Sequence, residues 1–124
     1  MDRTAIQHAG IAGEAVNGVN KRIHAALTHA EGADMKRLKD AYEVVASLKL
    51  LSQRLTLSMD QLAQLVSEWH DEGHLHTAPA IDVNATVADV NRALNSASER
   101  ARALFIDLDD VTKSLAPIGW KDPI

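Results

Sequence analysis

The last third of the chain carries apolar residues at alternating steps of four and three positions. This spacing is typical of a coiled-coil seam, in which a partner helix covers one face of a long helix. It predicts a helix over residues 83–116, capped by Asp82 or Asn84 and ended by Pro117 and Gly119. The stripe consists of Val83, Val87, Val90, Leu94, Ala97, Ala101, Leu104, Leu108, Val111 and Leu115.

A second helix is predicted over residues 35–70, because apolar positions again recur at helical spacing. Further leucines widen this face, which indicates contact from two sides. Residues 71–81 form a loop, since Gly73 and Pro79 interrupt the pattern. The stripe consists of Met35, Leu38, Tyr42, Val45, Leu48, Leu51, Leu55, Met59, Leu62, Val66 and Trp69.

A third helix, first in the chain, is predicted over residues 4–30 from a thinner stripe that runs from Ile6 to Ala30. Gly10, Gly13 and Gly18 each lower helix propensity by roughly 1 kcal/mol relative to alanine. They indicate either a weak helix or a close approach of another backbone. Residues 31–34 form a short turn, with Asp34 as the next N-cap, so the helices on either side of it run antiparallel.

The expected fold is therefore all-α: an elongated, antiparallel three-helix bundle with coiled-coil-like packing. One domain would span residues 1–116, followed by a short tail at 117–124. The second and third helices would each be about 50 Å long and the first about 40 Å. One end of the longer pair would then lack a third helix and offer an interaction surface. Its residues are Val66, Trp69, Val83 and Val87, joined by Trp120 of the tail.

The composition of the chain argues against several classes of function. The chain is 46% hydrophobic and 24% charged, as globular domains are. Its net charge of −4 argues against binding of nucleic acid. The absence of cysteine removes disulfides and thiolate chemistry. No apolar run approaches the roughly 18 residues of a membrane span, and no signal-peptide pattern opens the chain. We expect no membrane association and a cytoplasmic protein, with export by a signal-less route as an alternative.

The only cluster of metal-capable side chains lies around the predicted loop. His70 and His74 would share a face if the helix continued, and His76 or Glu72 could add a ligand. The His-Glu-x-x-His pattern is absent, however, and Gly73 falls between the first two histidines. No glutamate has a histidine three residues later, which excludes the Glu-x-x-His pairs of di-iron bundles. We expect no catalytic residue, cofactor or bound metal.

Two helical families were compared on their motifs. The long hairpin is similar in architecture to small secreted proteins of type VII systems, but Trp69 and Gly73 have the wrong interval for Trp-x-Gly. Tyr42 is followed four residues later by Ala46 rather than an acidic residue. The segments that begin at His24 and His29 do not match the acceptor site of histidine phosphotransfer domains. No family is assigned.

The sequence thus favours a non-enzymatic helical module for protein–protein interaction or scaffolding. It would self-associate, bind another helical protein, or both. One alternative is a bundle that responds to a metal or small ligand through His70, His74 and His76. Another is a small helical protein exported without a signal peptide.

Overall fold

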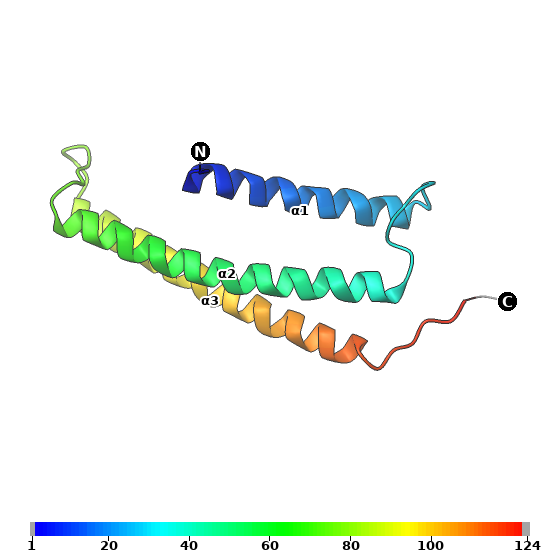
Figure 1. Cartoon of the computed structure of the whole chain (residues 1–124). Coiled ribbons are helices and arrows are strands. Elements are labelled where there is room, and N and C mark those ends of the chain that lie inside the picture. Colours follow the sequence, from blue (N-terminus) through cyan, green and yellow to red (C-terminus); the bar gives the residue numbers. More distant parts are fainter. Residues whose placement is uncertain (1, 123–124) are drawn as a thin grey trace. The chain divides into compact units, whose positions relative to one another are not determined.

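The computed structural model describes residues 2–122, which contain three helices and no strand (Figure 1). They are α1, Ala5–Leu27; α2, Leu38–Asp71; and α3, Val83–Leu115. The all-α class and the number of helices are confirmed. The final residues of the expected tail, 123–124, lie outside the described residues. The chain divides into two compact units, one holding residues 42–118 and the other the described residues up to 41 and from 119 onward.

In the first unit, α1 begins at a capping box. The Gln7 N–H donates to the Thr4 hydroxyl at 3.2 Å, and the Thr4 N–H donates to the Gln7 side-chain oxygen at 2.9 Å. The helix ends at Leu27, three residues earlier than expected, because His29 has a left-handed φ of 54°. No residue of α1 is buried.

The three glycines of α1 have open space around them. A Cβ atom at Gly10, Gly13 or Gly18 would meet nothing within 4 Å. No neighbouring backbone therefore requires a glycine at these positions. Of the two interpretations of these residues, the structure supports the weak helix over the close approach.

The helix α2 starts at Leu38 rather than at 35, and Asp40 explains the difference. Its carboxylate accepts the backbone N–H groups of Lys36 and Arg37, at 2.9 and 3.1 Å, from inside the first turn. These two bonds hold residues 36 and 37 outside the helix, and they lower the pKa of Asp40. Asp34, the expected N-cap, lies four residues before the observed start.

Residues 119–122 of the tail belong to this first unit. The Trp120 indole N–H donates to the Asp122 carboxylate at 2.7 Å, and the Arg37 guanidinium lies 4.0 Å from the same carboxylate group. Trp120 is 53% exposed. The ion pair brings Asp122 to the residues just before α2, while the indole ring of Trp120 stays open to solvent.

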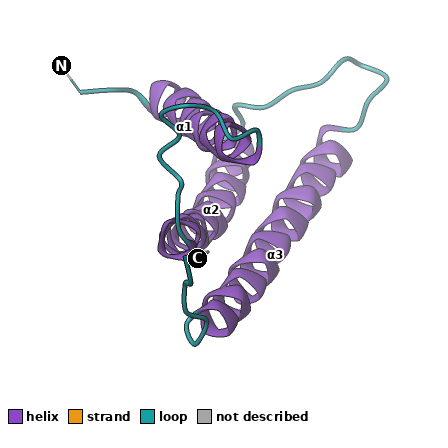
Figure 2. Ribbon diagram, turned by 90° about the vertical axis from the view of Figure 1, so that its right-hand side faces the viewer, coloured by secondary structure: helices purple, strands orange, loops and turns teal. Residues whose placement is uncertain are grey.

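In the second unit, α2 and α3 form an antiparallel hairpin (Figure 2). The helix α2 ends before Gly73, whose φ of 80° is left-handed. The side chain of Asp82 caps α3 by accepting a hydrogen bond from the Asn84 N–H at 3.0 Å. Asp82 was one of the two predicted N-cap residues. The loop that connects the two long helices thus has about the predicted length.

At alternate positions of the predicted stripe, the residue of α3 that faces α2 lies one position later than expected. Val90, Leu104 and Val111 were expected in the seam, but each is 40–47% exposed. The covered positions lie one residue later: Ser98 and Thr112 are buried, and Asn91 and Phe105 are half-buried. The other half of the stripe is covered as expected, with Val87 buried and Leu94, Ala101, Leu108 and Leu115 half-buried.

The helix α2 shows the same displacement. Leu55, Leu62 and Trp69 were expected in the seam but are 40–44% exposed. Thr56, Ala63 and His70, each one residue later, are half-buried. Ser52, at 1% exposed, is the most covered residue of the hairpin. Small and hydroxyl side chains between the helices leave room for close approach, whereas leucine at the same positions would separate the two backbones.

Candidate interaction surface

One side of the hairpin is held by polar contacts between the helices, three of which join side chains. Successive contacts are separated by the same number of residues on both helices, while the numbering rises on α3 and falls on α2. The separation is seven residues between the first and second contacts and eleven between the second and third. The equal steps show that one antiparallel register runs along the whole hairpin. The bonded pairs, donor first, are Asn91 Nδ2 to Ser67 Oγ at 2.8 Å, Ser98 Oγ to Asp60 Oδ1 at 2.5 Å and Lys49 Nζ to Asp109 Oδ1 at 2.9 Å.

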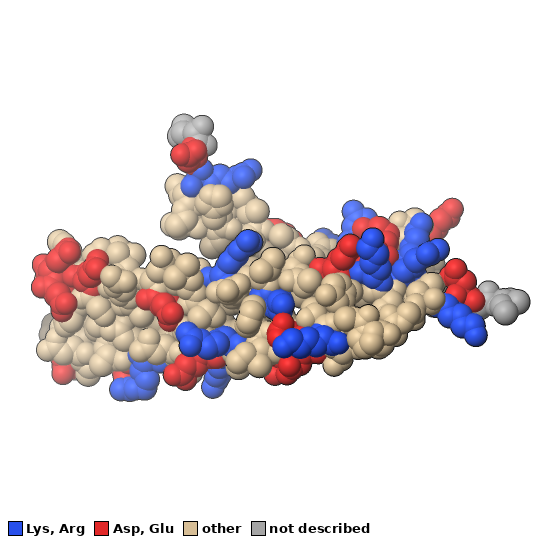
Figure 3. All heavy atoms as spheres, turned by 60° about the horizontal axis from the view of Figure 1, so that its bottom comes forward, with Lys and Arg blue, Asp and Glu red and all other residues tan. Residues whose placement is uncertain are grey.

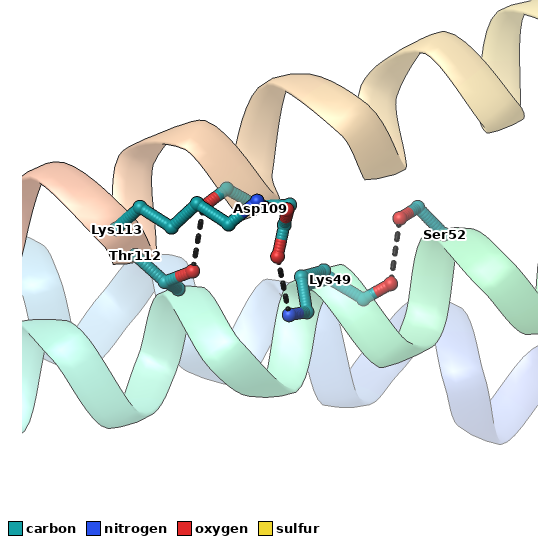
Figure 4. Close-up of polar contacts among 5 residues, drawn as sticks. All are labelled: Lys49, Ser52, Asp109, Thr112 and Lys113. Atoms are coloured by element: carbon teal, nitrogen blue, oxygen red, sulfur yellow. Dashed lines mark hydrogen bonds and ion pairs between the residues drawn. The ribbon is translucent and has the colours of Figure 1, made fainter.

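The third contact is part of a small charge cluster (Figure 4). Asp109 accepts from Lys113 at 2.7 Å on its own helix and from Lys49 at 2.9 Å on α2. The hydrogen bond from Lys113, followed by that from Lys49, lowers the pKa of Asp109, and the same bond raises the pKa of Lys113. The Lys49 ammonium also lies 5.6 Å from the centre of the Phe105 ring. The cluster ties the two helices together at one level.

The buried hydroxyl groups near this cluster bond to their own helices. The Ser52 hydroxyl donates to the Lys49 carbonyl at 2.7 Å, and the Thr112 hydroxyl donates to the Asp109 carbonyl at 2.8 Å (Figure 4). Both groups are therefore satisfied locally, as serine and threonine often are within helices. Their role in the hairpin is close packing of the two backbones.

The opposite side of the hairpin is apolar and half-exposed. We call it the apolar side and define it by the residues that flank the covered seam. Their exposed fractions lie between 38% and 47%. They are Leu55, Leu62, Leu65 and Trp69 on α2, and Val90, Leu104 and Val111 on α3.

Helical geometry places both groups on the same side. On each helix the exposed line lies one residue before the covered line, so it is turned by about 100° in the same sense around that helix axis. The axes run in opposite directions and the covered lines face each other. Equal turns about opposed axes bring both exposed lines to one side, away from the polar contacts.

The seven residues that define this side carry no ionisable group, and Leu51, Ser58, Ala93 and Ala97 extend it. Charged residues adjoin it on both helices: Arg54 on α2, and Arg100 and Asp107 on α3. Elsewhere the charges are mixed: in the face shown in Figure 3, Lys and Arg interleave with Asp and Glu. The face in that view offers no broad patch of one sign of the kind that nucleic acid requires.

The residues predicted for the interaction surface are placed differently from one another. Val87 is buried at 8% exposed and is therefore part of the hairpin interior. Val66 and Val83 are half-buried. Trp69 is 43% exposed and belongs to the apolar side, and Trp120 is 53% exposed on the tail.

Sequence reasoning missed the apolar side because it assigned Leu62, Leu104 and their equivalents to the seam. A signal for the correct face was present on α3. Asn91, Ser98 and Thr112 are spaced by multiples of seven residues and lie one position after the apolar line. A polar line with the seam's own period indicates a contact face that uses small polar side chains.

The histidines of the loop are not brought together as a metal site. His70 lies in the last turn of α2 and is half-buried, whereas His74 and His76 follow the end of the helix and are exposed. His74 Nε2 lies 3.1 Å from the Glu72 carboxylate. Among residues 2–122, no group of three histidine, cysteine, aspartate or glutamate side chains is arranged to hold a metal ion.

Two further findings bear on function. None of the helices in the described part of the chain combines the length and apolarity that crossing a membrane requires. Comparison of the chain with family models, curated proteins and solved structures finds no match.

Proposed function

We propose that this protein is a non-catalytic helical module for protein–protein interaction or scaffolding, which binds itself, another helical protein or both through the apolar side of the α2–α3 hairpin. The observation that carries the proposal is the half-exposure of seven large apolar side chains on one side of the hairpin. Contiguous apolar surface of this kind marks interaction sites more often than it marks free solvent-facing surface.

The polar groups of the hairpin support a structural role. Lys49, Asp60 and Asp109 are engaged across the helices, and the buried hydroxyls bond to backbone carbonyls. Such bonds set the register of the two helices. A partner would therefore bind by packing against the apolar side.

The proposal includes a cytoplasmic location, which is supported by the absence of cysteine from the sequence. Fractionation of the native host tests it. Recovery in the cell lysate agrees with the proposal, and recovery in the culture supernatant would favour the export alternative.

The function is tested by a native mass spectrum of the full chain purified gently from its own host. The expected result is a mass above that of one chain, from further copies of the chain, a second protein or both. An added mass of tens of daltons per chain would favour the metal-responsive alternative at His70, His74 and His76. A bare single chain across the micromolar range would overturn the proposal.

A further inference from the structure

We infer that the occupant of the apolar side is a second copy of the same side, so that two hairpins pack face to face as an antiparallel four-helix bundle. This inference rests on the proposed function and specifies its partner. It is carried by three features of the hairpin: the levels of its apolar side chains, the amount of apolar surface and the lack of ionisable groups among the seven residues that define the apolar side.

The apolar side chains of the two helices lie at matching levels. The Ser98–Asp60 bond sets the register: Leu62 lies two residues after Asp60, and Ala97 lies one residue before Ser98. Leu55 and Trp69 pair with residues of α3 in the same way, within about one residue or 1.5 Å along the axis. The resulting layers are Leu55 with Leu104, Leu62 with Ala97, and Trp69 with Val90.

Layers with a seven-residue repeat are the unit from which four-helix bundles are built. Each layer of one hairpin supplies two side chains, and a second hairpin supplies the other two. Successive layers would lie about 10 Å apart along the bundle. The apolar side therefore has the geometry of half a bundle core.

The amount of apolar surface fits a stable dimer. A standard interface buries about 800 Å² on each partner, of which about 65% is apolar in homodimers. The seven side chains, each 38–47% exposed, together present on the order of 500 Å² of apolar surface. The remaining area would come from the polar rim.

The charges around the apolar side are compatible with a second copy. A two-fold interface brings the same patch together from both chains, so a charged residue near its centre meets its own charge. The seven residues that define the apolar side carry no ionisable group, and the adjoining Arg54, Arg100 and Asp107 include both signs. Association with itself therefore does not concentrate at the interface the negative charge of the chain, whose net charge is −4.

Sedimentation equilibrium of the purified full chain tests the inference with two matched pairs of variants. Leu62→Glu and Leu104→Glu place a carboxylate on the apolar side. Leu57→Glu and Ile106→Glu place one on the same helices outside it, at residues that are more exposed, 58% and 54%. Far-UV circular dichroism checks that all four variants retain their helices.

The wild type should sediment at twice the chain mass, or a higher even multiple. The two apolar-side variants should raise the dissociation constant about 100-fold or more, because each dimer would bury two unpaired carboxylates. The two control variants should change it less than threefold. If a glutamate variant loses its helices, Leu62→Ala against Leu57→Ala gives the same comparison without a charge.

A monomeric wild type would overturn the inference, as would equal weakening by all four variants. These failures are separable from failure of the proposed function. A single chain in sedimentation that is found with a second protein in the native mass spectrum would leave an interaction module whose partner is a different protein.

Discussion

The Ser98 hydroxyl of α3 donates a hydrogen bond to the Asp60 carboxylate of α2, and Ser98 is only 5% exposed. The pair shows how this hairpin differs from an apolar coiled coil, because its contact face uses polar bonds and small side chains. The larger apolar side chains are displaced to one flank.

Removing the Ser98 hydroxyl should weaken the hairpin. Ser98→Ala leaves the Asp60 carboxylate without this donor, and the free energy of unfolding should fall by about 1 kcal/mol. Urea denaturation followed by circular dichroism measures the change. Ser114→Ala, at an exposed position of the same helix, is the control and should alter the value by less than half as much. Equal effects of the two variants would contradict the assigned role.

The Asp109 cluster should make stability depend on pH at both extremes. Lys113 and Lys49 lower the pKa of Asp109, so its contribution is present above the ordinary value of 3.8 and is lost as the pH falls through the lowered pKa. Lys113 has a raised pKa, so its contribution is present below 10.5 and is lost at higher pH.

The variant Asp109→Asn isolates the acid part of this dependence. At pH 7 its melting temperature should lie below that of the wild type, and the difference should shrink as the pH falls below 3.8. Asp107→Asn, an exposed neighbour, should show no such convergence. A difference that stays constant down to pH 2 would exclude the ion pairs as its cause.

Alanine at the glycines of α1 should stabilise that helix. Gly10→Ala and Gly13→Ala meet open space, so each should raise its stability by about 0.5–1 kcal/mol. Hydrogen exchange of the α1 amides measures this directly. Gly73→Ala is the opposite case, because its φ of 80° is unfavourable for alanine, and it should lower stability. No slowing of exchange in α1 would show that another backbone needs these glycines.

Much of the fold could be predicted from sequence. Helical periodicity located all three helices, and Asp82, which caps α3, was one of the two predicted N-cap residues. The start of α2 was misplaced because Asp40 reaches back to the N–H groups of residues 36 and 37, a local competition that periodicity does not register.

The candidate site was harder to predict, because the rotation of each helix decides which apolar residues are covered. Apolarity alone favours Leu55 and Leu62 as seam residues. Close approach of the helices instead selects Thr56 and Ala63, one position later, and leaves the leucines outside. The displacement of a single residue separates a buried seam from an exposed surface, so sequence reasoning recovered Trp69 but missed most of the apolar side.

Self-association through the apolar side is tested by the solvent exposure of Trp69, measured in a Trp120→Phe background so that one indole remains. Trp69 is 43% exposed in the single chain. If the apolar side is an interface, iodide should quench this tryptophan at least twofold less in the associated protein than in the same background carrying Leu104→Glu, which serves as the monomeric reference. Equal quenching in the two proteins, with helices intact in both, would contradict the account.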